Sequence, residues 1–255
     1  VIKLTDEIYQ KGEKEKNSPQ MLKAYAWRMK YREMLNPDSL YAGLKGLEQW
    51  VKQTDQPMDR AILHSLIAGI YANYAANNQW QLRQRTEIVG QTPSADIREW
   101  TANMFVEKVR TNVKEALADS VLLLKTSSRD YIPFVELGKT SEYYHHDLYH
   151  LLASRGIDAL LQVEKLGSGY TETNAVNPVK QDIIAIYGNM LSAYKAAGLK
   201  EGYVLTALNY LEWRRGAERY IRPLQVKGEA SVLTDDTYLK ALNTLKSKYA
   251  SEPIC

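Results

Sequence analysis

The sequence of 255 residues contains one cysteine, Cys255, at its last position. A single cysteine cannot form an intrachain disulfide, and it cannot build a metal site that needs several thiolates. Long apolar runs are also missing. The longest nearly unbroken ones, such as residues 121–124, are far shorter than the roughly 20 residues that a membrane-spanning helix requires. The sequence therefore excludes a disulfide scaffold and predicts no transmembrane segment in this chain.

Charge of one sign does not dominate either. The chain has 33 basic and 30 acidic residues, mixed along its length, for a formal net charge of +3. Such a mixture gives no concentrated field that would attract nucleic acid or an anionic membrane. We therefore expect no nucleic acid partner. The hydrophobic content of 45% is nevertheless enough to bury a sizeable core.

Almost every periodic segment has the pattern of an amphipathic helix, and neighbouring helices pair across short turns. In the clearest pair, apolar or small positions recur at three- and four-residue spacing on both sides of residues 17–19. A second pair covers residues 178–221, where Gly188, Ala193 and Ala207 are small enough for close helix approach. The predicted fold is all-α: stacked antiparallel helical hairpins in an α-α superhelix, a tetratricopeptide-like solenoid.

The bounds of the predicted helices follow from hydrophobic periodicity and from the Pro, Gly and Asn residues that begin or end them. They cover residues 4–16, 19–35, 37–54, 58–76, 97–124 with a kink near residues 119–120, 141–166, 178–197, 199–221 and 234–250.

The strongest of these helices is predicted at residues 58–76. Ile62, Leu66, Ile70 and Tyr74 lie there at four-residue spacing on one face, which predicts a central core helix. The polar residues 77–96 follow and are a candidate sub-boundary. We expect one helical-repeat domain over residues 1–255, as a fragment of a longer chain.

Three histidines form the tightest group of candidate metal ligands. His146 and His150 are spaced by four, as in a metal pair on a helix, and His145 is adjacent. A zinc hydrolase would need a glutamate beside the first histidine and a third ligand, but His146 is followed by Asp147. The favoured interpretation is a surface helix with solvated histidines. We assign no metal-binding residue on this basis.

Other patterns of chemistry have ordinary structural interpretations. The glycines of residues 167–169 follow a predicted helix and read as its stop, since a phosphate loop would lie between a strand and a helix. Asp235 and Asp236 stand at a predicted helix start, where capping and the helix dipole account for them. We therefore predict no enzyme, no catalytic residue and no cofactor.

The aromatic balance favours rings with one polar end, with 18 Tyr and 5 Trp against 2 Phe. Tyrosines along the concave face of a solenoid would bind an extended peptide or pack against a neighbouring domain. Alternatively, the rings fill helix–helix contacts and keep their hydroxyls at the surface. Both interpretations remain open at the level of sequence.

Three runs carry a resemblance to a known family: IYQKGEKEKNSPQMLKAYAWRMKY, DRAILHSLIAGIYANY, and the stretch from DIREW through LYHLLASRGIDAL. In this order they resemble the N-terminal helical region of very large alpha-2-macroglobulin-family proteins of Bacteroidetes. The similarity spans nearly the whole chain. It consists of the repeated pattern of helical hairpins and of these short runs, with no catalytic signature.

The resemblance implies an exported cell-envelope protein, periplasmic or associated with the outer membrane, with a lipid anchor upstream of Val1. Macroglobulin and thioester domains would follow this segment. The thioester run of the family, a Cys, one further residue, then Glu and Gln, is absent here, so no functional residue transfers.

Two functional hypotheses follow. The first is a non-catalytic helical-repeat scaffold or protein-interaction module, the N-terminal arm of such a protein, whose partner is its own downstream domains or another envelope protein. The alternative is a stand-alone envelope helical protein that binds a peptide or a carbohydrate.

Overall fold

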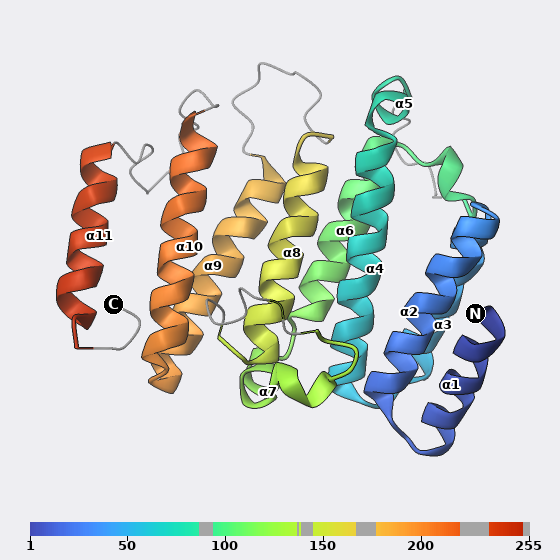
Figure 1. Ribbon diagram of the computed structural model, residues 1–255. Coiled ribbons are helices and arrows are strands. Elements are labelled where there is room, and N and C mark those ends of the chain that lie inside the picture. The colour runs from blue at the N-terminus through green and yellow to red at the C-terminus, as the bar shows by residue number, and fades with distance from the viewer. Residues whose placement is uncertain (87–93, 137, 139–144, 167–176, 220–234, 252–255) are drawn as a thin grey trace. The chain divides into compact units, whose positions relative to one another are not determined.

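The computed structural model describes residues 1–86, 94–136, 138, 145–166, 177–219 and 235–251. Within these ranges every regular element is a helix, apart from one isolated bridge between Ser127 and Asp147 (Figure 1). The all-α prediction is confirmed. The finer prediction of a tetratricopeptide-like superhelix stays a prediction. None of the described helices is both long enough and apolar enough to span a membrane.

The chain divides into two compact units. The first comprises residues 1–141 and 146–169, and the second comprises residues 142–145 and 170–255. The candidate sub-boundary at residues 77–96 lies inside the first unit, and the expectation of a single domain stays a prediction. The first unit contains α1 (Ile2–Lys14), α2 (Ser18–Leu35), α3 (Ser39–Gln53), α4 (Pro57–Asn77), α5 (Gln79–Arg83), η1 (Ile97–Glu99), α6 (Ala102–Ala116), α7 (Ser120–Lys125), η2 (Ser128–Tyr131) and α8 (Leu148–Glu164). The second contains α9 (Pro178–Ala197), α10 (Lys200–Arg219) and α11 (Asp235–Tyr249).

Local capping explains the helix starts that the sequence predicted well. The Asn17 side chain accepts a hydrogen bond from the Gln20 backbone N–H (3.1 Å) at the start of α2, where a proline occupies the first turn. The Asn177 side chain likewise accepts from the Val179 N–H (2.9 Å) at the start of α9. Each cap satisfies a backbone donor that has no partner within the helix. These turns therefore form where the sequence places them.

The helix predicted at residues 97–124 is interrupted. The backbone of Trp100 and Thr101 is extended, so a short 3-10 turn precedes α6. A second break follows α6, and the Asp119 side chain caps α7 by accepting from the Leu122 N–H (3.0 Å). The predicted kink near residues 119–120 is therefore a full break between two helices.

The helix predicted at residues 141–166 begins later, at Leu148. The Asp147 side chain caps it by accepting from the His150 N–H (2.6 Å), while residues 145–147 are not helical. This segment pairs with residues 126–128: the Ser128 N–H donates to the His146 carbonyl (2.8 Å), and the Leu148 N–H donates to the Thr126 carbonyl (2.9 Å). The predicted start at Ser141, the predicted stop at residues 167–169, and Cys255 lie outside the described residues.

Helix α4 lies at the centre of the first unit, in contact with α3, α6 and α8 (Figure 1). Leu63 and Ile67 of α4 are almost completely buried, as are Phe105 of α6 and Leu160 of α8. Helices α6 and α8 also pack on one another, where Gly156 lies so close to Val113 that a Cβ there would come within 2.8 Å of its Cγ1. Three helices thus enclose the main core.

The prediction that this face of α4 forms the core is only partly correct. Ile62 is buried, but Leu66, Ile70 and Tyr74 are half-buried. The side chains that face the core instead include Leu63 and Ile67. The reason is that α4 has neighbours on several sides, so its apolar residues surround most of its circumference and no single stripe identifies the core.

Several aromatic rings fill helix contacts. Tyr71 stacks on Trp100, with ring centroids 5.3 Å apart, and Trp100 lies 5.2 Å from Phe105. The Tyr71 hydroxyl reaches Glu48 on α3 and donates to its carboxylate (3.1 Å). For these rings the interpretation as helix packing is confirmed. The expected position of the hydroxyl at the surface is wrong for Tyr71, which is buried and donates to a protein carboxylate.

In the second unit, α9 and α10 form the predicted hairpin, and Gly198, directly after α9, has a positive φ of 70°. The close approach occurs at Gly202, where a Cβ would come within 2.5 Å of the Tyr194 ring. The prediction for Gly188 is wrong, because a Cβ at that position would meet open space. Helix α11 contacts α10 but has no buried residue.

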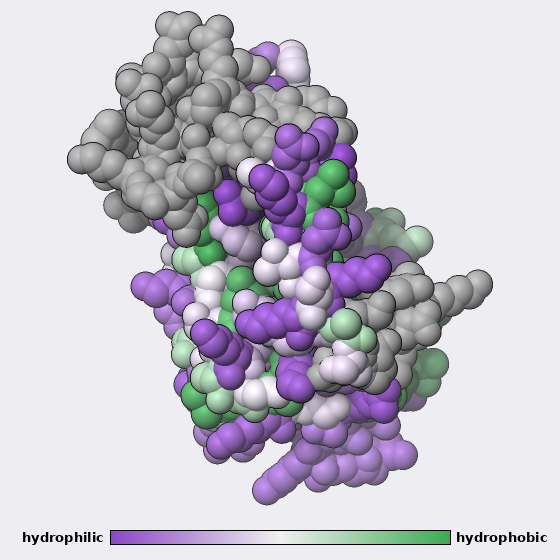
Figure 2. All heavy atoms as spheres, turned by 90° about the vertical axis from the view of Figure 1, so that its left-hand side faces the viewer, coloured by the Kyte–Doolittle hydropathy of each residue, from purple (hydrophilic) through white to green (hydrophobic). Residues whose placement is uncertain are grey.

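In Figure 2, hydrophilic residues are interspersed with small hydrophobic areas over the coloured surface.

The burial pattern of α4 predicts unequal effects for two leucines one turn apart. Leu63→Ala should lower the free energy of unfolding by about 2–5 kcal/mol, because the side chain is fully buried. Leu66→Ala should cost less than about 2 kcal/mol, because that side chain is half-buried. Urea denaturation of both variants checks the order, and an equal or larger loss for Leu66→Ala would contradict it.

Candidate functional site

A groove of about 440 Å³ lies between α2, α3 and α4 in the first unit. Its lining combines apolar residues, three tyrosines and a polar rim. The lining residues are Tyr25, Ala26, Met29, Lys30, Glu33, Pro37, Leu40, Tyr41, Leu47, Leu66, Ile70, Asn73, Tyr74, Asn77 and Asn78. Leu66, Ile70 and Tyr74, which the sequence placed in the core, form part of this surface.

Two glycines of α3 allow the α2 side of the groove to form. The Tyr25 hydroxyl donates to the Gly43 carbonyl (3.0 Å), which ties α2 to α3. The same hydroxyl occupies the space where a side chain of Gly46 would stand, and a Cβ at Gly43 would come within 2.6 Å of the Met29 side chain. Any larger residue at either glycine would require Tyr25 or Met29 to move.

Each groove tyrosine has protein groups against its ring. The guanidinium of Arg28 lies 4.6 Å from the Tyr25 ring, and that of Arg98 lies 4.9 Å from the Tyr41 ring. Tyr74 stacks on Phe105, with centroids 5.4 Å apart and an interplanar angle of 22°. These contacts hold the rings in fixed positions. Burial, followed by a hydrogen bond with Tyr74, raises the pKa of Tyr41 to about 12, so its hydroxyl is neutral at ordinary pH.

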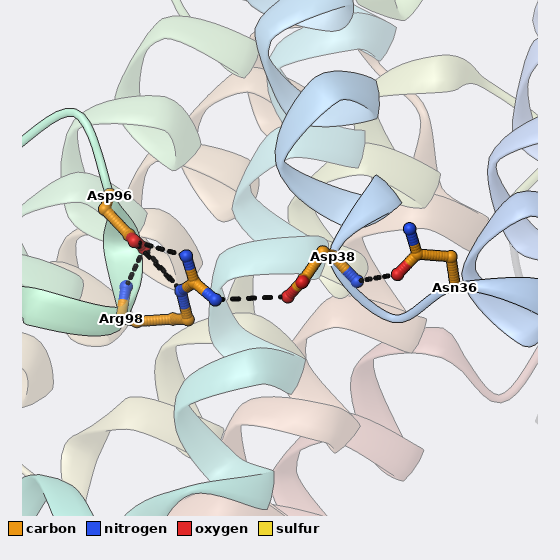
Figure 3. Close-up of polar contacts among 4 residues, drawn as sticks. All are labelled: Asn36, Asp38, Asp96 and Arg98. Atoms are coloured by element: carbon orange, nitrogen blue, oxygen red, sulfur yellow. Dashed lines mark hydrogen bonds and ion pairs between the residues drawn. The ribbon is translucent and has the colours of Figure 1, made fainter.

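Figure 3 shows a polar cluster of Asn36, Asp38, Asp96 and Arg98. It adjoins the groove because the Arg98 guanidinium lies over the Tyr41 ring. Arg98 donates to the Asp96 carboxylate from Nε (2.9 Å) and Nη2 (2.7 Å), and its Nη1 donates to Asp38 (3.2 Å). The Asp38 N–H in turn donates to the Asn36 side chain (3.0 Å). The hydrogen bonds from Arg98 lower the pKa of Asp96. The cluster links the segment before α6 to the turn between α2 and α3.

The two walls of the groove differ in character. On the α4 wall, the exposed Asn73 and Asn77 follow Leu66 and Ile70 along the helix. On the α2 wall the rim carries one cation and one anion, Lys30 and Glu33. The Lys30 ammonium lies 4.9 Å from the Trp27 ring. The lining as a whole has no net charge.

A buried carboxylate lies away from the groove, at the first turn of α4. Asp59 is 5% exposed and accepts hydrogen bonds from the Ser18 hydroxyl and the Tyr131 hydroxyl (3.0 Å). It joins the starts of α2 and α4 to η2. Since both oxygens accept from protein donors, Asp59 acts as a structural junction. The sequence contained no signal that these three residues would meet.

The candidate histidines are placed differently from the prediction. His150 is completely buried at the start of α8, so its interpretation as a solvated surface residue is wrong. The reason is that the first turn of α8 packs inward, where Asp147 and Leu148 are buried as well. His146 is half-buried and lies before the helix. In the described part of the chain, no three His, Cys, Asp or Glu side chains are grouped so as to hold a metal ion.

His64, the remaining histidine, contacts Asn112 across the interface between α4 and α6 (2.8 Å). The Asn112 amide also donates to the Lys108 carbonyl within α6 (2.8 Å). This pair therefore belongs to helix packing.

No protein-family model matches this sequence, and neither a curated protein nor a solved structure matches it.

The burial of His150 predicts a measurable effect on stability. His150→Ala should lower the free energy of unfolding by about 1–3 kcal/mol, because it leaves a cavity in a packed region. His146→Ala is the matched control and should change stability by about 0.5 kcal/mol or less, since its side chain is half-exposed. Thermal and urea denaturation compare them. A neutral result for His150→Ala would mean that this helix start is open to solvent.

The buried tyrosines predict a loss of stability at alkaline pH. Burial, followed by the charge of a nearby carboxylate, raises the pKa of Tyr71, of Tyr131 and, to about 12, of Tyr149. The folded state thus favours the neutral hydroxyls, whereas an unfolded tyrosine ionises near about pH 10. The contribution of these hydroxyls to the free energy of unfolding should be complete below about pH 10. It should decline as the pH rises through their pKa values in the folded state.

Urea denaturation at a series of alkaline pH values measures this dependence. Tyr131→Phe should be less stable near neutral pH, because Asp59 loses a donor, and should lose less additional stability as the pH rises. A free energy of unfolding that stays constant from about pH 9 to about pH 12 would show that the pKa values of these tyrosines are not raised in the folded state.

Proposed function

We propose that this chain is a non-catalytic helical-repeat scaffold or protein-interaction module. The observation that carries the proposal is the groove between α2, α3 and α4. It combines half-buried apolar residues with a polar rim, the composition that protein-binding surfaces share. Its walls are held by helix packing and by the Tyr25 and Arg98 contacts, so a partner would meet a preformed surface.

Two helical hairpins support the finer part of the proposal, a tetratricopeptide-like arrangement. Helices α1 and α2 pack together across a short turn, as do α9 and α10 in the second unit. Such units bury apolar faces by stacking on neighbours, and their exposed surfaces are available for partners.

The family resemblance suggests where this module works. It would be the N-terminal arm of an alpha-2-macroglobulin-like protein of the cell envelope in Bacteroidetes, periplasmic or associated with the outer membrane, with a lipid anchor upstream. The partner would be the downstream domains of the same polypeptide or another envelope protein. Any thioester chemistry would belong to those domains.

The second candidate is a stand-alone envelope helical protein that binds a peptide or a carbohydrate. The tyrosines and asparagines of the groove favour it, because rings with hydroxyls and side-chain amides are common where proteins bind either ligand.

The reading frame beyond Cys255 and a binding measurement test the first candidate together. We expect the frame to continue into macroglobulin domains with the thioester run. The polypeptide it encodes should bind residues 1–255 in isothermal titration calorimetry. Ile70→Asp should weaken this binding by at least about tenfold, because it places a charge in the apolar part of the groove.

Ile8→Asp provides the matched control. Ile8 is an exposed isoleucine on α1 that does not line the groove, so the same substitution there should leave the affinity unchanged. A stop codon soon after Cys255 would remove the macroglobulin proposal and leave the stand-alone protein as the better one. Equal affinities for the two variants would show that the partner binds elsewhere.

A further inference from the structure

The groove tyrosines discriminate between the two ligand classes. A sugar ring binds an aromatic residue by stacking on a broad, open ring face. Tyr41 already has the Arg98 guanidinium over its ring, and Tyr74 has Phe105 stacked on it. Tyr25 has Arg28 over its ring and Trp50 at a centroid distance of 5.6 Å. Each of these rings therefore already packs against a protein group, which leaves less open ring face for a sugar and disfavours a carbohydrate.

The α4 wall has the spacing of an extended peptide backbone. Asn73 and Asn77 are four residues apart on one helix face, which separates them by about 6 Å along the helix axis. An extended chain repeats every two residues, at roughly 6.4–6.8 Å. Each asparagine amide has both donor and acceptor groups. Two exposed amides at this spacing can therefore pair with the N–H and C=O groups of alternate ligand residues.

The apolar part of the groove lies one turn further back along the same helix. Leu66 and Ile70 precede Asn73 and Asn77 at three- and four-residue spacing, so all four share one side of α4. Leu40 of α3 and Met29 of α2 complete this apolar surface. In an extended ligand, alternate side chains point to the same face. Those side chains would enter the apolar surface while the backbone meets the asparagines.

The charge of the groove limits the ligand further. The lining contains one cation, Lys30, and one anion, Glu33, which cancel. The Lys30 ammonium lies over the Trp27 ring, and the α4 rim is made of uncharged amides. A groove without net charge gives no attraction to a segment that carries several like charges, and burying such charges against its apolar part would cost free energy of desolvation, so an uncharged segment fits it better.

We propose that the groove between α2, α3 and α4 binds an extended, uncharged peptide segment with apolar side chains at alternate positions. Asn73 and Asn77 pair with its backbone, and Leu66, Ile70, Leu40 and Met29 receive its side chains. This inference rests on the proposed function as a protein-interaction module and specifies the form of the partner that the groove accepts.

Fluorescence anisotropy with defined probes tests the inference on residues 1–255. The first probe set consists of labelled peptides of about nine residues, with leucine at every second position, serine or glutamine between, and blocked ends. The second set has the same compositions with the leucines adjacent. A labelled chitin oligosaccharide is the third probe. We expect the alternating peptides to bind about tenfold or more tightly than the rearranged ones, with little dependence on salt.

The double variant Asn73→Ala/Asn77→Ala should weaken peptide binding by about tenfold, because it removes the amides that pair with the backbone. Both side chains are exposed, so thermal unfolding should be nearly unchanged. Asn189→Ala, at an exposed position of α9 in the second unit, is the matched control and should bind like the unaltered protein. Methylation of alternate backbone nitrogens of the peptide should weaken binding in the same way.

Several results would overturn the inference: equal binding of alternating and rearranged peptides, no effect of the double asparagine variant, binding of the oligosaccharide alone, or no binding of any probe. Binding of the downstream polypeptide to residues 1–255 distinguishes a failure of this inference from a failure of the proposed function. If it binds in a manner sensitive to Ile70→Asp while the peptides do not bind, the proposed function stands and the extended-peptide inference falls.

Discussion

The burial of α4 is the constraint on which the first unit depends. This helix contacts α3, α6 and α8, so its apolar residues must face several neighbours at once. Leu63 and Ile67 are almost completely buried, and Tyr71 joins the packing by stacking on Trp100 and donating to Glu48. Close-packed interiors leave few voids, so the remaining side of such a helix becomes the surface that the unit offers to others. In this chain that side carries the groove.

Two sets of contacts fix the α2 and α3 side of the groove. Gly43 and Gly46 let the Tyr25 side chain lie against α3, and the Tyr25 hydroxyl closes this contact with a backbone hydrogen bond. On another side, Arg98 connects Asp96 to Asp38 and covers Tyr41. A preformed surface loses less conformational entropy on binding than one that must be ordered. The structural contacts therefore also serve the proposed recognition of an extended segment.

Buried polar groups define the end of the first unit where α2, α4 and α8 begin. Asp59 accepts from Ser18 and Tyr131, and Asp147 caps α8 while residues 126–128 pair with residues 146–148. Buried carboxylates are costly unless they are hydrogen-bonded, so these partners stabilise one particular arrangement of the three helix starts. The junction involves residues far apart in the chain, and the buried His150 lies in the first turn of α8, which Asp147 caps.

The sequence by itself determined the all-α class and the helix starts at Asn17 and Asn177, because capping and periodicity act over a few residues. The tertiary structure alone decided which side of α4 is core, that Leu66 and Ile70 line a groove, and that His150 is buried. It also decided that α6 ends before α7, and that Gly202 is a point of close helix approach while Gly188 is not. These features depend on which helices become neighbours, and contacts between distant segments leave no periodic signal in the residues that make them.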